Sequence, residues 1–325
     1  MSIATNGSLG LKEEAVYGTG VVPDKFVEFA DESFKGDSGL IIPDLINGLR
    51  VERRVLPGAY TIAGDVNFPL TPEGITGWVL KGIFGKVVTT PNGDGTYTHV
   101  FTVGKSIPSF TVDIDRLAAA FRYTGVVFGS LAVSIDKQKT VDCKLATIAR
   151  KDELITAQVP TFSDLDQYAG IDVGVEINSV PNSDVETASF TFNNEIEPVH
   201  TLDGTRFIRK AVPKTFKTDG SFTMEFGDKT MLEYFWGAAG ATYPQRHLQS
   251  FPLKFNMIQD VHIGATERHY SMTVEFTRVY IQLDAPLKAN NRIIQNVAFH
   301  PVQDLSTDEV VTVTLVNGES GYPDA

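Results

Sequence analysis

The chain is poor in the features that mark secreted, membrane-spanning and nucleic-acid-binding proteins. Its 325 residues include one cysteine, Cys143, so no internal disulfide can form and synthesis in a reducing cytosol is indicated. It has no run of about 18 apolar residues and no basic segment leading into an apolar one at the N-terminus, so we expect neither membrane insertion nor a signal peptide. With 28 Lys and Arg against 40 Asp and Glu, the net charge of −12 opposes phosphate binding.

Catalytic and metal-binding motifs are also missing. Gly104–Ser106 resembles the end of a phosphate-binding loop, but His99 stands where the first glycine is needed. Asp164–Asp166 begins like a calcium loop and then lacks the turn glycine. The six histidines form no HxxxH or HExxH pair, although separate histidines as metal ligands stay an alternative. We therefore expect no enzymatic activity and no cofactor, and we interpret Cys143 as a buried structural thiol.

What the sequence does contain is an internal repeat. Gly48–Leu70 aligns without a gap to Gly204–Phe226 at an offset of 156. A second match pairs Ser109–Leu117 with Ser271–Val279. The halves differ in charge, because residues 1–160 carry 16 Lys and Arg against 18 Asp and Glu, whereas residues 161–325 carry 12 against 22. The repeat predicts two copies of one β-rich unit, which suits an assembly of repeated parts better than a single catalytic pocket.

Each copy reads as many short strands and one short helix. Apolar alternation predicts strands, a helix is expected over about Ile75–Phe84, and an apolar stripe predicts a second helix after Asp228. The turn Asn92–Gly95 marks a hairpin. We predict a mainly β fold with two tandem β-sandwich or barrel domains, each with one short flanking helix, over residues 1–160 and 161–325. Arg50–Val55 is expected to be a strand, and the stretch near Ser163–Tyr168 is a candidate for a further short helix.

Two groups of charged residues are candidates for function. Arg50 and Arg53 form a basic cluster that recurs as Arg206 and Arg209. Acidity elsewhere opposes nucleic-acid binding, so we interpret these arginines as subunit contacts, with a solvated loop as the alternative.

The second group is acidic. Asp113 and Asp115 share one face of a predicted strand, and Glu275 stands opposite Asp113 in the second sequence match. Such carboxylates are either a solvated strand face or part of a negatively charged inner wall.

Several phrases resemble the tail tube proteins of long-tailed bacteriophages. The opening LGLKEEAVYGTGVVPDKFVEF is similar to the start of that family. GDVNFPLTPEGITGWVLKGIFG, YTHVFT, SFTFNNEIEPV and GSFTMEFGDKTMLEYFWG are similar to its later strand, helix and hairpin sequences. The resemblance extends from about Leu9 to Val316 and is in a duplicated-domain form.

The resemblance implies a structural virion protein that is made in the host cytoplasm. It implies inner strands that join edge to edge around a ring, and rings that stack through an N-terminal arm and a long loop, here residues 35–58. Genomic DNA would pass through the lumen without specific binding, and the ruler, terminator and tail-tip proteins would be partners. Two units per chain favour three chains per ring with pseudo-sixfold symmetry, and a hexamer is the alternative.

The contractile type of the tail stays open, with a non-contractile tail as our expectation. A tail-tip or baseplate module that binds a host receptor or carbohydrate is the alternative function.

Overall fold

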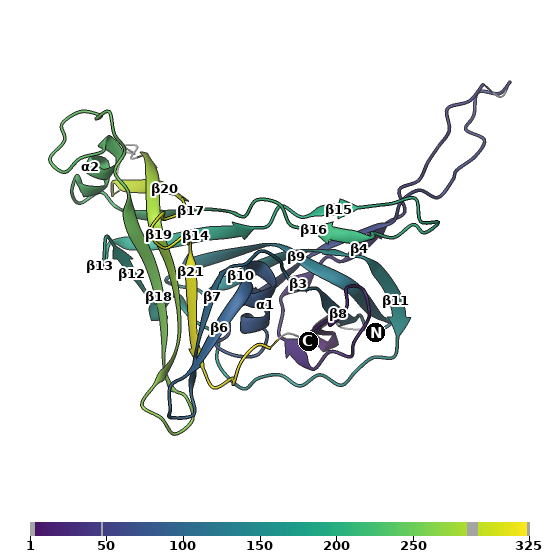
Figure 1. The fold of residues 1–325 in the computed structure, drawn as a ribbon, viewed down its shortest axis with the longest axis horizontal. Coiled ribbons are helices and arrows are strands. Elements are labelled where there is room, and N and C mark those ends of the chain that lie inside the picture. Colours follow the sequence, from purple (N-terminus) through teal and green to yellow (C-terminus); the bar gives the residue numbers. More distant parts are fainter. Residues whose placement is uncertain (1–3, 47, 285–291, 324–325) are drawn as a thin grey trace.

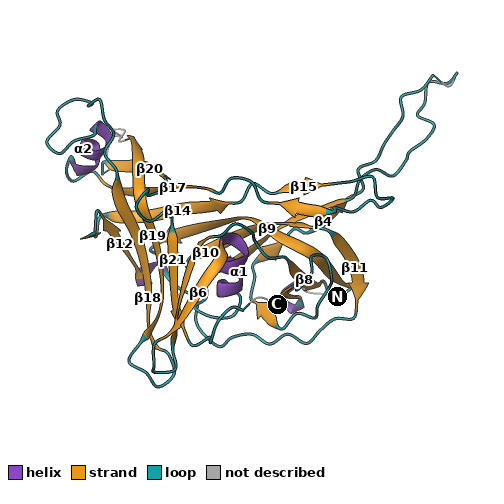
Figure 2. Cartoon of the chain, in the orientation of Figure 1, coloured by secondary structure: helices purple, strands orange, loops and turns teal. Residues whose placement is uncertain are grey.

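The computed structural model describes residues 4–46, 48–284 and 292–323, in which antiparallel strands dominate (Figures 1 and 2). Two short helices, α1 (Thr76–Phe84) and α2 (Thr230–Trp236), accompany them. No helix in the described ranges is long and apolar enough to cross a membrane. The mainly β architecture with two helices confirms the predicted fold class.

The strands divide between the two halves of the chain. The first half holds β1 (Ser8–Glu13), β2 (Lys25–Val27), β3 (Asp31–Glu32), β4 (Lys35–Asp37), β5 (Thr61–Pro69), β6 (Gly85–Pro91), β7 (Tyr97–Val103), β8 (Phe110–Asp115), β9 (Ala120–Asp136), β10 (Asp142–Ala149) and β11 (Lys151–Ile155). The second half holds β12 (Val173–Ile177), β13 (Val180–Asn182), β14 (Val185–Asn193), β15 (Glu197–Val199), β16 (Lys210–Val212), β17 (Lys217–Glu225), β18 (Phe251–His262), β19 (His269–Asp284), β20 (Ile294–Pro301) and β21 (Thr312–Asn317).

One sheet runs through both halves, and we call it the shared sheet. Its eight positions in spatial order are β3 with β4, β5, β10, β9, β14, β17, β20 and β19. The central joint is β9–β14, where residues 130–136 pair with residues 187–193. Four positions thus come from each half, and the backbone ladder does not stop between them.

Two flanking sheets cover the core side of the shared sheet. The first flanking sheet has the order β2, β1, β8, β9, β11, and the second has β13, β12, β18, β19, β21, β7, β6. The long strands β9 and β19 belong to a flanking sheet at their start and to the shared sheet at their end. Figure 1 shows the two flanking sheets toward opposite ends of the molecule.

The strand pairing repeats in the second half of the chain. Equivalent elements are β1 and β12, β2 and β13, β3 with β4 and β14, β5 and β17, α1 and α2, β8 and β18, β9 and β19, β10 and β20, and β11 and β21. The bounds of β5 and β17 differ by 156, the offset of the first sequence match. A register shift also recurs, between Phe110 and Val112 in β8 and between Phe251 and Leu253 in β18.

The second sequence match joins strands at different positions. Ser109–Leu117 covers β8, whereas Ser271–Val279 lies in β19. The counterpart of β8 is β18, because β8 pairs with β9 as β18 pairs with β19. That match was therefore wrong as a structural equivalence. Short alternating strands of Ser, Thr and Val look alike wherever they occur in a sandwich, because each simply places one side chain in two toward the core.

One hydrophobic cluster fills the space between the sheets in both halves. Phe84 of α1 packs edge-on against Phe192 of β14, with ring centroids 5.0 Å apart. Helix α1 comes close to β9 because Gly82 has no side chain: a Cβ there would lie 2.3 Å from the Phe128 ring. Burial of each such phenylalanine contributes roughly 1.5–3 kcal/mol. The predicted division at residue 160 falls in a stretch, 156–169, without helix or strand, and the division into domains stays a prediction.

Glu14, in the sequence Lys12-Glu13-Glu14, connects several segments of the first flanking sheet. The buried carboxylate of Glu14 accepts hydrogen bonds from Thr111 Oγ1 at 2.9 Å and the Gly125 amide at 2.8 Å through Oε1. Its Oε2 accepts from the Gly18 amide and from Ser109 Oγ, both at 2.7 Å. Four donors from three chain segments thus converge on one side chain. Anchored in this way, the segment after β1 lies against β8 and β9.

The neighbouring Glu13 fixes the same segment to α1. Its Oε2 lies 2.6 Å from Lys81 Nζ, and both side chains are almost fully buried. Lys81 Nζ also donates to the Pro323 carbonyl at 2.9 Å, so both ends of the chain meet at this helix. A buried pair like this one is costly to break, because the remaining charge has no water around it.

Most predicted elements are confirmed, with two exceptions. The helix near Ile75–Phe84, the hairpin around Asn92–Gly95 and the buried state of Cys143 are all observed. Burial raises the pKa of the Cys143 thiol, which keeps it protonated. The predicted strand Arg50–Val55 and the possible helix near Ser163–Tyr168 were wrong, because both stretches are irregular.

Replacement of Glu14 by Gln should lower the free energy of unfolding by about 2–4 kcal/mol. Gln has an NH2 group in place of one carboxylate oxygen, so two of the four buried donors would lose their acceptor. Urea unfolding of the unassembled chain measures this. Glu267→Gln is the matched control at an exposed position and should change stability by less than about 0.5 kcal/mol. Equal effects of the two substitutions would contradict a structural role for Glu14.

Candidate assembly surfaces

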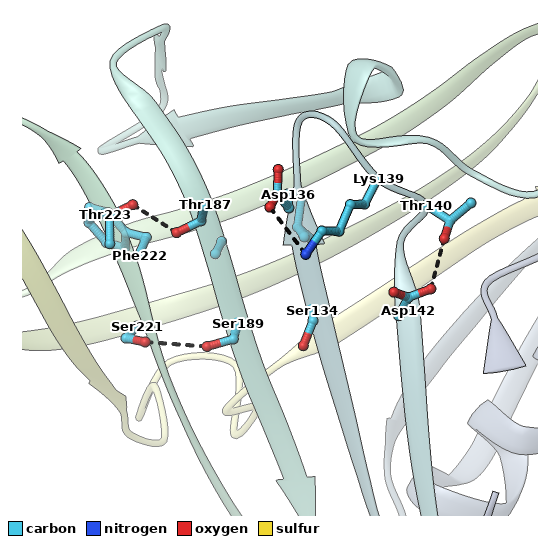
Figure 3. A pocket seen from close by; sticks show the side chains of 12 residues that line it. Ser134, Asp136, Lys139, Thr140, Asp142, Thr187, Ser189, Ser221, Phe222 and Thr223 are labelled. Atoms are coloured by element: carbon cyan, nitrogen blue, oxygen red, sulfur yellow. Dashed lines mark hydrogen bonds and ion pairs between the residues drawn. The ribbon is translucent and has the colours of Figure 1, made fainter. Parts of the chain in front are cut away.

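The side of the shared sheet that faces away from the core is polar, and we call it the polar face. Along each strand, alternate side chains enter the core and the others reach this face. Many of the latter are small or polar: Asn67, Ser130, Ser134, Asp142, Ser189, Thr191, Ser221, Thr223, Asn296 and His300. Figure 3 shows part of this surface. The hydroxyl oxygens of Thr187 and Thr223 lie 2.7 Å apart there, and those of Ser189 and Ser221 lie 3.2 Å apart.

Acidic residues outnumber basic ones on the polar face. The register places seven carboxylates there, Asp31, Asp37, Asp65, Asp136, Asp142, Asp219 and Glu225, and three lysines, Lys35, Lys144 and Lys217. Lys144 lies 2.9 Å from Asp65, whose hydrogen bond and charge raise the pKa of that lysine. Lys217 pairs with Glu195. The face is therefore a hydrated, net negative surface on which Lys144 and Lys217 are paired with carboxylates.

The polar face carries open hollows. A shallow cavity of about 290 Å³ opens between the β9–β10 turn and strands β14 and β17, lined by side chains such as Asp136, Lys139 and Ser221 (Figure 3). Among the described residues, no three His, Cys, Asp or Glu side chains gather closely enough to hold a metal ion. The described part of this face therefore offers many weak polar contacts in open hollows.

The shared sheet ends in two uncovered edges. Strand β4 pairs only with β5, and Lys35, Gly36 and Asp37 are all exposed. At the other end, β19 beyond Val279 pairs with β20 alone, counting only strands in the described ranges. An uncovered strand edge presents free backbone N–H and C=O groups, which favour pairing with another chain.

A long projection leaves the sheet between β4 and β5, and we call residues 38–60 the arm. Figure 1 shows it extending beyond the rest of the molecule. A single isolated bridge, Ile41 with Leu56, crosses it. It carries nine exposed apolar side chains, Leu40, Ile41, Ile42, Leu45, Ile46, Leu49, Val51, Val55 and Leu56. A concentration of exposed apolar side chains on this scale marks a surface for another protein.

The equivalent connection in the second half is the β15–β16 hairpin, residues 194–216. It lies against the base of the arm, where Arg206 joins the two. The Arg206 guanidinium donates to the carbonyls of Gly58 and Ser38, both at 2.8 Å, and stacks over the Tyr60 ring. The Tyr60 amide in turn donates to the Arg206 carbonyl at 2.7 Å.

The predicted arginines are thus separated by the structure. Arg50 and Arg53 lie exposed on the arm, whereas Arg206 fastens its base. Arg209 is exposed, and its backbone amide donates to the Val199 carbonyl within the hairpin. A role in subunit contacts remains a proposal for all four.

The predicted acidic residues lie in the flanking sheets and not on the polar face. Asp113 is buried and forms a two-point ion pair with Arg122 at 2.7 and 2.8 Å, which raises the pKa of the guanidinium. Asp115 accepts from the Leu117 amide, and Glu275 lies 3.5 Å from Lys254. Asp113 therefore presents no free charge. The carboxylates of β5, β10 and β17 were not predicted, although they alternate with apolar residues in the sequence.

The sequence was compared with known proteins. The family model described as phage tail tube protein matches residues 4–255. No curated protein matches the chain.

Arg206→Ala should free the arm from the hairpin, because three contacts to the arm base are lost together. We expect faster proteolytic cleavage within residues 39–57 and a change of less than about 1 kcal/mol in global stability, since the side chain is exposed. Limited proteolysis with mass spectrometry measures the cleavage. Arg209→Ala is the matched control, and cleavage of both variants at the same rate would contradict the fastening role.

Proposed function

The chain belongs to the phage tail tube protein family, and we propose that it forms stacked rings whose central channel conducts the viral genome into the host. Family membership makes it a structural component of the virion tail. The observation that carries the proposal is the shared sheet, which has a polar, acidic face and an uncovered edge at each end. Such a sheet is suited to closing into a ring with copies of itself.

Three chains per ring agree best with the dimensions of the sheet. Eight positions per chain give 24 in a ring, and at about 4.8 Å per strand the circumference is roughly 115 Å and the diameter about 37 Å before strand tilt. That leaves room for side chains and one DNA duplex. Six chains would double both values and leave a channel far wider than one duplex needs. We therefore propose a trimer with pseudo-sixfold symmetry.

The internal repeat supplies the register of the joint between chains. Within one chain, Ser130 of β9 pairs with Asn193 of β14. The equivalent of Ser130 in the second half is Gln282 of β19, and the equivalent of Asn193 in the first half is Asp37 of β4. Gln282 of one chain should therefore lie opposite Asp37 of the next, and every ring joint would repeat the β9–β14 geometry.

The charge of the polar face suits a channel for DNA. If this face lines the lumen, its carboxylates repel the phosphates over about 8 Å at physiological salt, so the duplex does not bind the wall. A basic wall would gain affinity through counterion release and hold the genome back. We propose Asp65, Asp142 and Asp219 as lumen residues in place of Asp113, Asp115 and Glu275.

The arm and the hairpin 194–216 fit the stacking of rings. The apolar side chains of the arm are about half exposed or more in the single chain, and a neighbouring ring would bury them. Arg50 and Arg53 would then meet carboxylates of that ring. Contacts of the end rings with ruler, terminator and tail-tip proteins, and an N-terminal arm that adds to stacking, belong to the same proposal.

Electron microscopy tests the ring directly. The purified chain at high concentration should form hollow tubes, and class averages should show three copies and six similar lobes per ring. A double variant with Asp37→Cys and Gln282→Cys should give covalent trimers from oxidised tubes. Ser130→Cys with Asn193→Cys is the matched pair within one chain and should give no covalent species larger than the monomer. Six copies per ring would refute the trimer, and a chain that stays monomeric would refute the tube.

Charge reversal tests the lining of the channel. Virions whose tails carry Asp142→Lys with Asp219→Lys should release DNA more slowly, and more so at low salt, because the net charge of the wall changes by +4 for each chain. Asp260→Lys with Glu267→Lys, at exposed positions of the second flanking sheet and its turn, is the control of equal charge change. Unchanged release from normally assembled tails of the first variant would exclude the polar face as the channel wall.

A further inference from the structure

We propose that residues 237–250 of one chain bind the free edge of β11 in the neighbouring chain and extend its first flanking sheet. We call residues 237–250 the post-helix segment. The inference rests on the proposed ring, but it concerns the layer behind the channel wall, which the closure of the shared sheet does not determine. The partner is a second copy of this chain.

The template is a joint within the chain. In the first half, the β6–β7 hairpin follows α1 directly, and β7 crosses to pair with β21 of the second half. Phe101 of β7 lies opposite Val313, and Tyr97 lies opposite Asn317. The two halves are therefore joined twice, at β9–β14 in the shared sheet and at β7–β21 in the flanking layer.

The repeat locates the counterparts of both partners. The post-helix segment follows α2 as the hairpin follows α1, and both helices end at a glycine in the left-handed conformation, Gly85 and Gly237. The counterpart of β21 is β11, since each pairs with the first part of the long strand of its half. A ring that repeats the first joint brings these two elements of neighbouring chains to equivalent positions.

Both counterparts are uncovered in the single chain. Strand β11 pairs only with β9, and the post-helix segment forms no ladder with any strand of the described residues. Leu154 of β11 is the equivalent of Val313, yet Leu154 is 71% exposed whereas Val313 is fully buried beside β7. The post-helix segment exposes Tyr243 and Leu248, at 66% and 71%. Apolar side chains are thus exposed on both surfaces, whereas the β7–β21 joint buries the equivalent Val313.

The charges of the two surfaces also agree. The post-helix segment contains Arg246 and His247 and no acidic residue. Strand β11 carries Lys151, Asp152 and Glu153 and so has a net charge of −1; Glu153 pairs with Lys151 at 2.9 Å, and Asp152 accepts a hydrogen bond from Tyr60 Oη at 3.1 Å. The exposed Arg246 and the net negative strand thus have opposite charges, which favours heterologous contact over self-association of either surface.

Cysteine cross-linking in assembled tubes tests the contact. Leu154→Cys is combined in separate variants with Tyr243→Cys, Arg246→Cys or Leu248→Cys, so that the result does not depend on one register. At least one pair should give covalent trimers after oxidation, and the unassembled chain should stay monomeric. Native Cys143 is buried and should not react.

The ring joint provides the internal control. If Asp37→Cys with Gln282→Cys cross-links but none of the three outer pairs does, the inference is wrong and the ring stands. If tubes fail to form at all, both proposals fall. Hydrogen exchange gives a second measurement, in which amides of residues 237–250 should exchange at least about tenfold more slowly in tubes than in the free chain. Unchanged exchange there in intact tubes would also overturn the inference.

Discussion

The pairing of β9 with β14 is the constraint on which the rest of the structure depends. Residues 130–136 and 187–193 form one uninterrupted ladder, so two similar units act as one sheet with one core side and one polar side. Side chains alternate along a strand, so a slip of one residue would carry Phe190 and Phe192 out of the core and onto the polar face. The register of this single joint therefore fixes which residues are buried and which are displayed.

Local signals in the sequence predicted local structure well. The turn Asn92–Gly95 gave the hairpin, and the apolar stripes gave both helices, because these elements depend on residues close in the chain. The shared sheet could not be predicted in the same way, since its neighbours β10 and β5, or β17 and β20, are far apart in sequence. Arg50–Val55 has the composition of a strand but no partner strand within reach, so it stays irregular.

The candidate site shows the same limit. Asp113 and Asp115 were recognisable as an acidic pair, but only the fold shows that Arg122 neutralises Asp113 in a flanking sheet. The greater acidity of the second half also does not concentrate on the polar face. Five of its seven carboxylates come from the first half, because the extra charge of the second half lies in the flanking sheets and loops. Net charge by halves could not show on which side of a sheet the charges lie.

The arm, residues 38–60, and the β15–β16 hairpin, residues 194–216, are the same connection in two conformations, with 23 residues in each. Arg206 joins them. A ring of three chains would thus present three projecting apolar arms alternating with three hairpins that lie against the arm bases. The next ring could then sit in only three equivalent orientations, 120° apart, although its channel looks sixfold. Duplication followed by divergence of this connection would in this way give a tube with a smooth channel and a fixed rotational phase between its rings. Twisting one ring would then transmit torque along the whole tail.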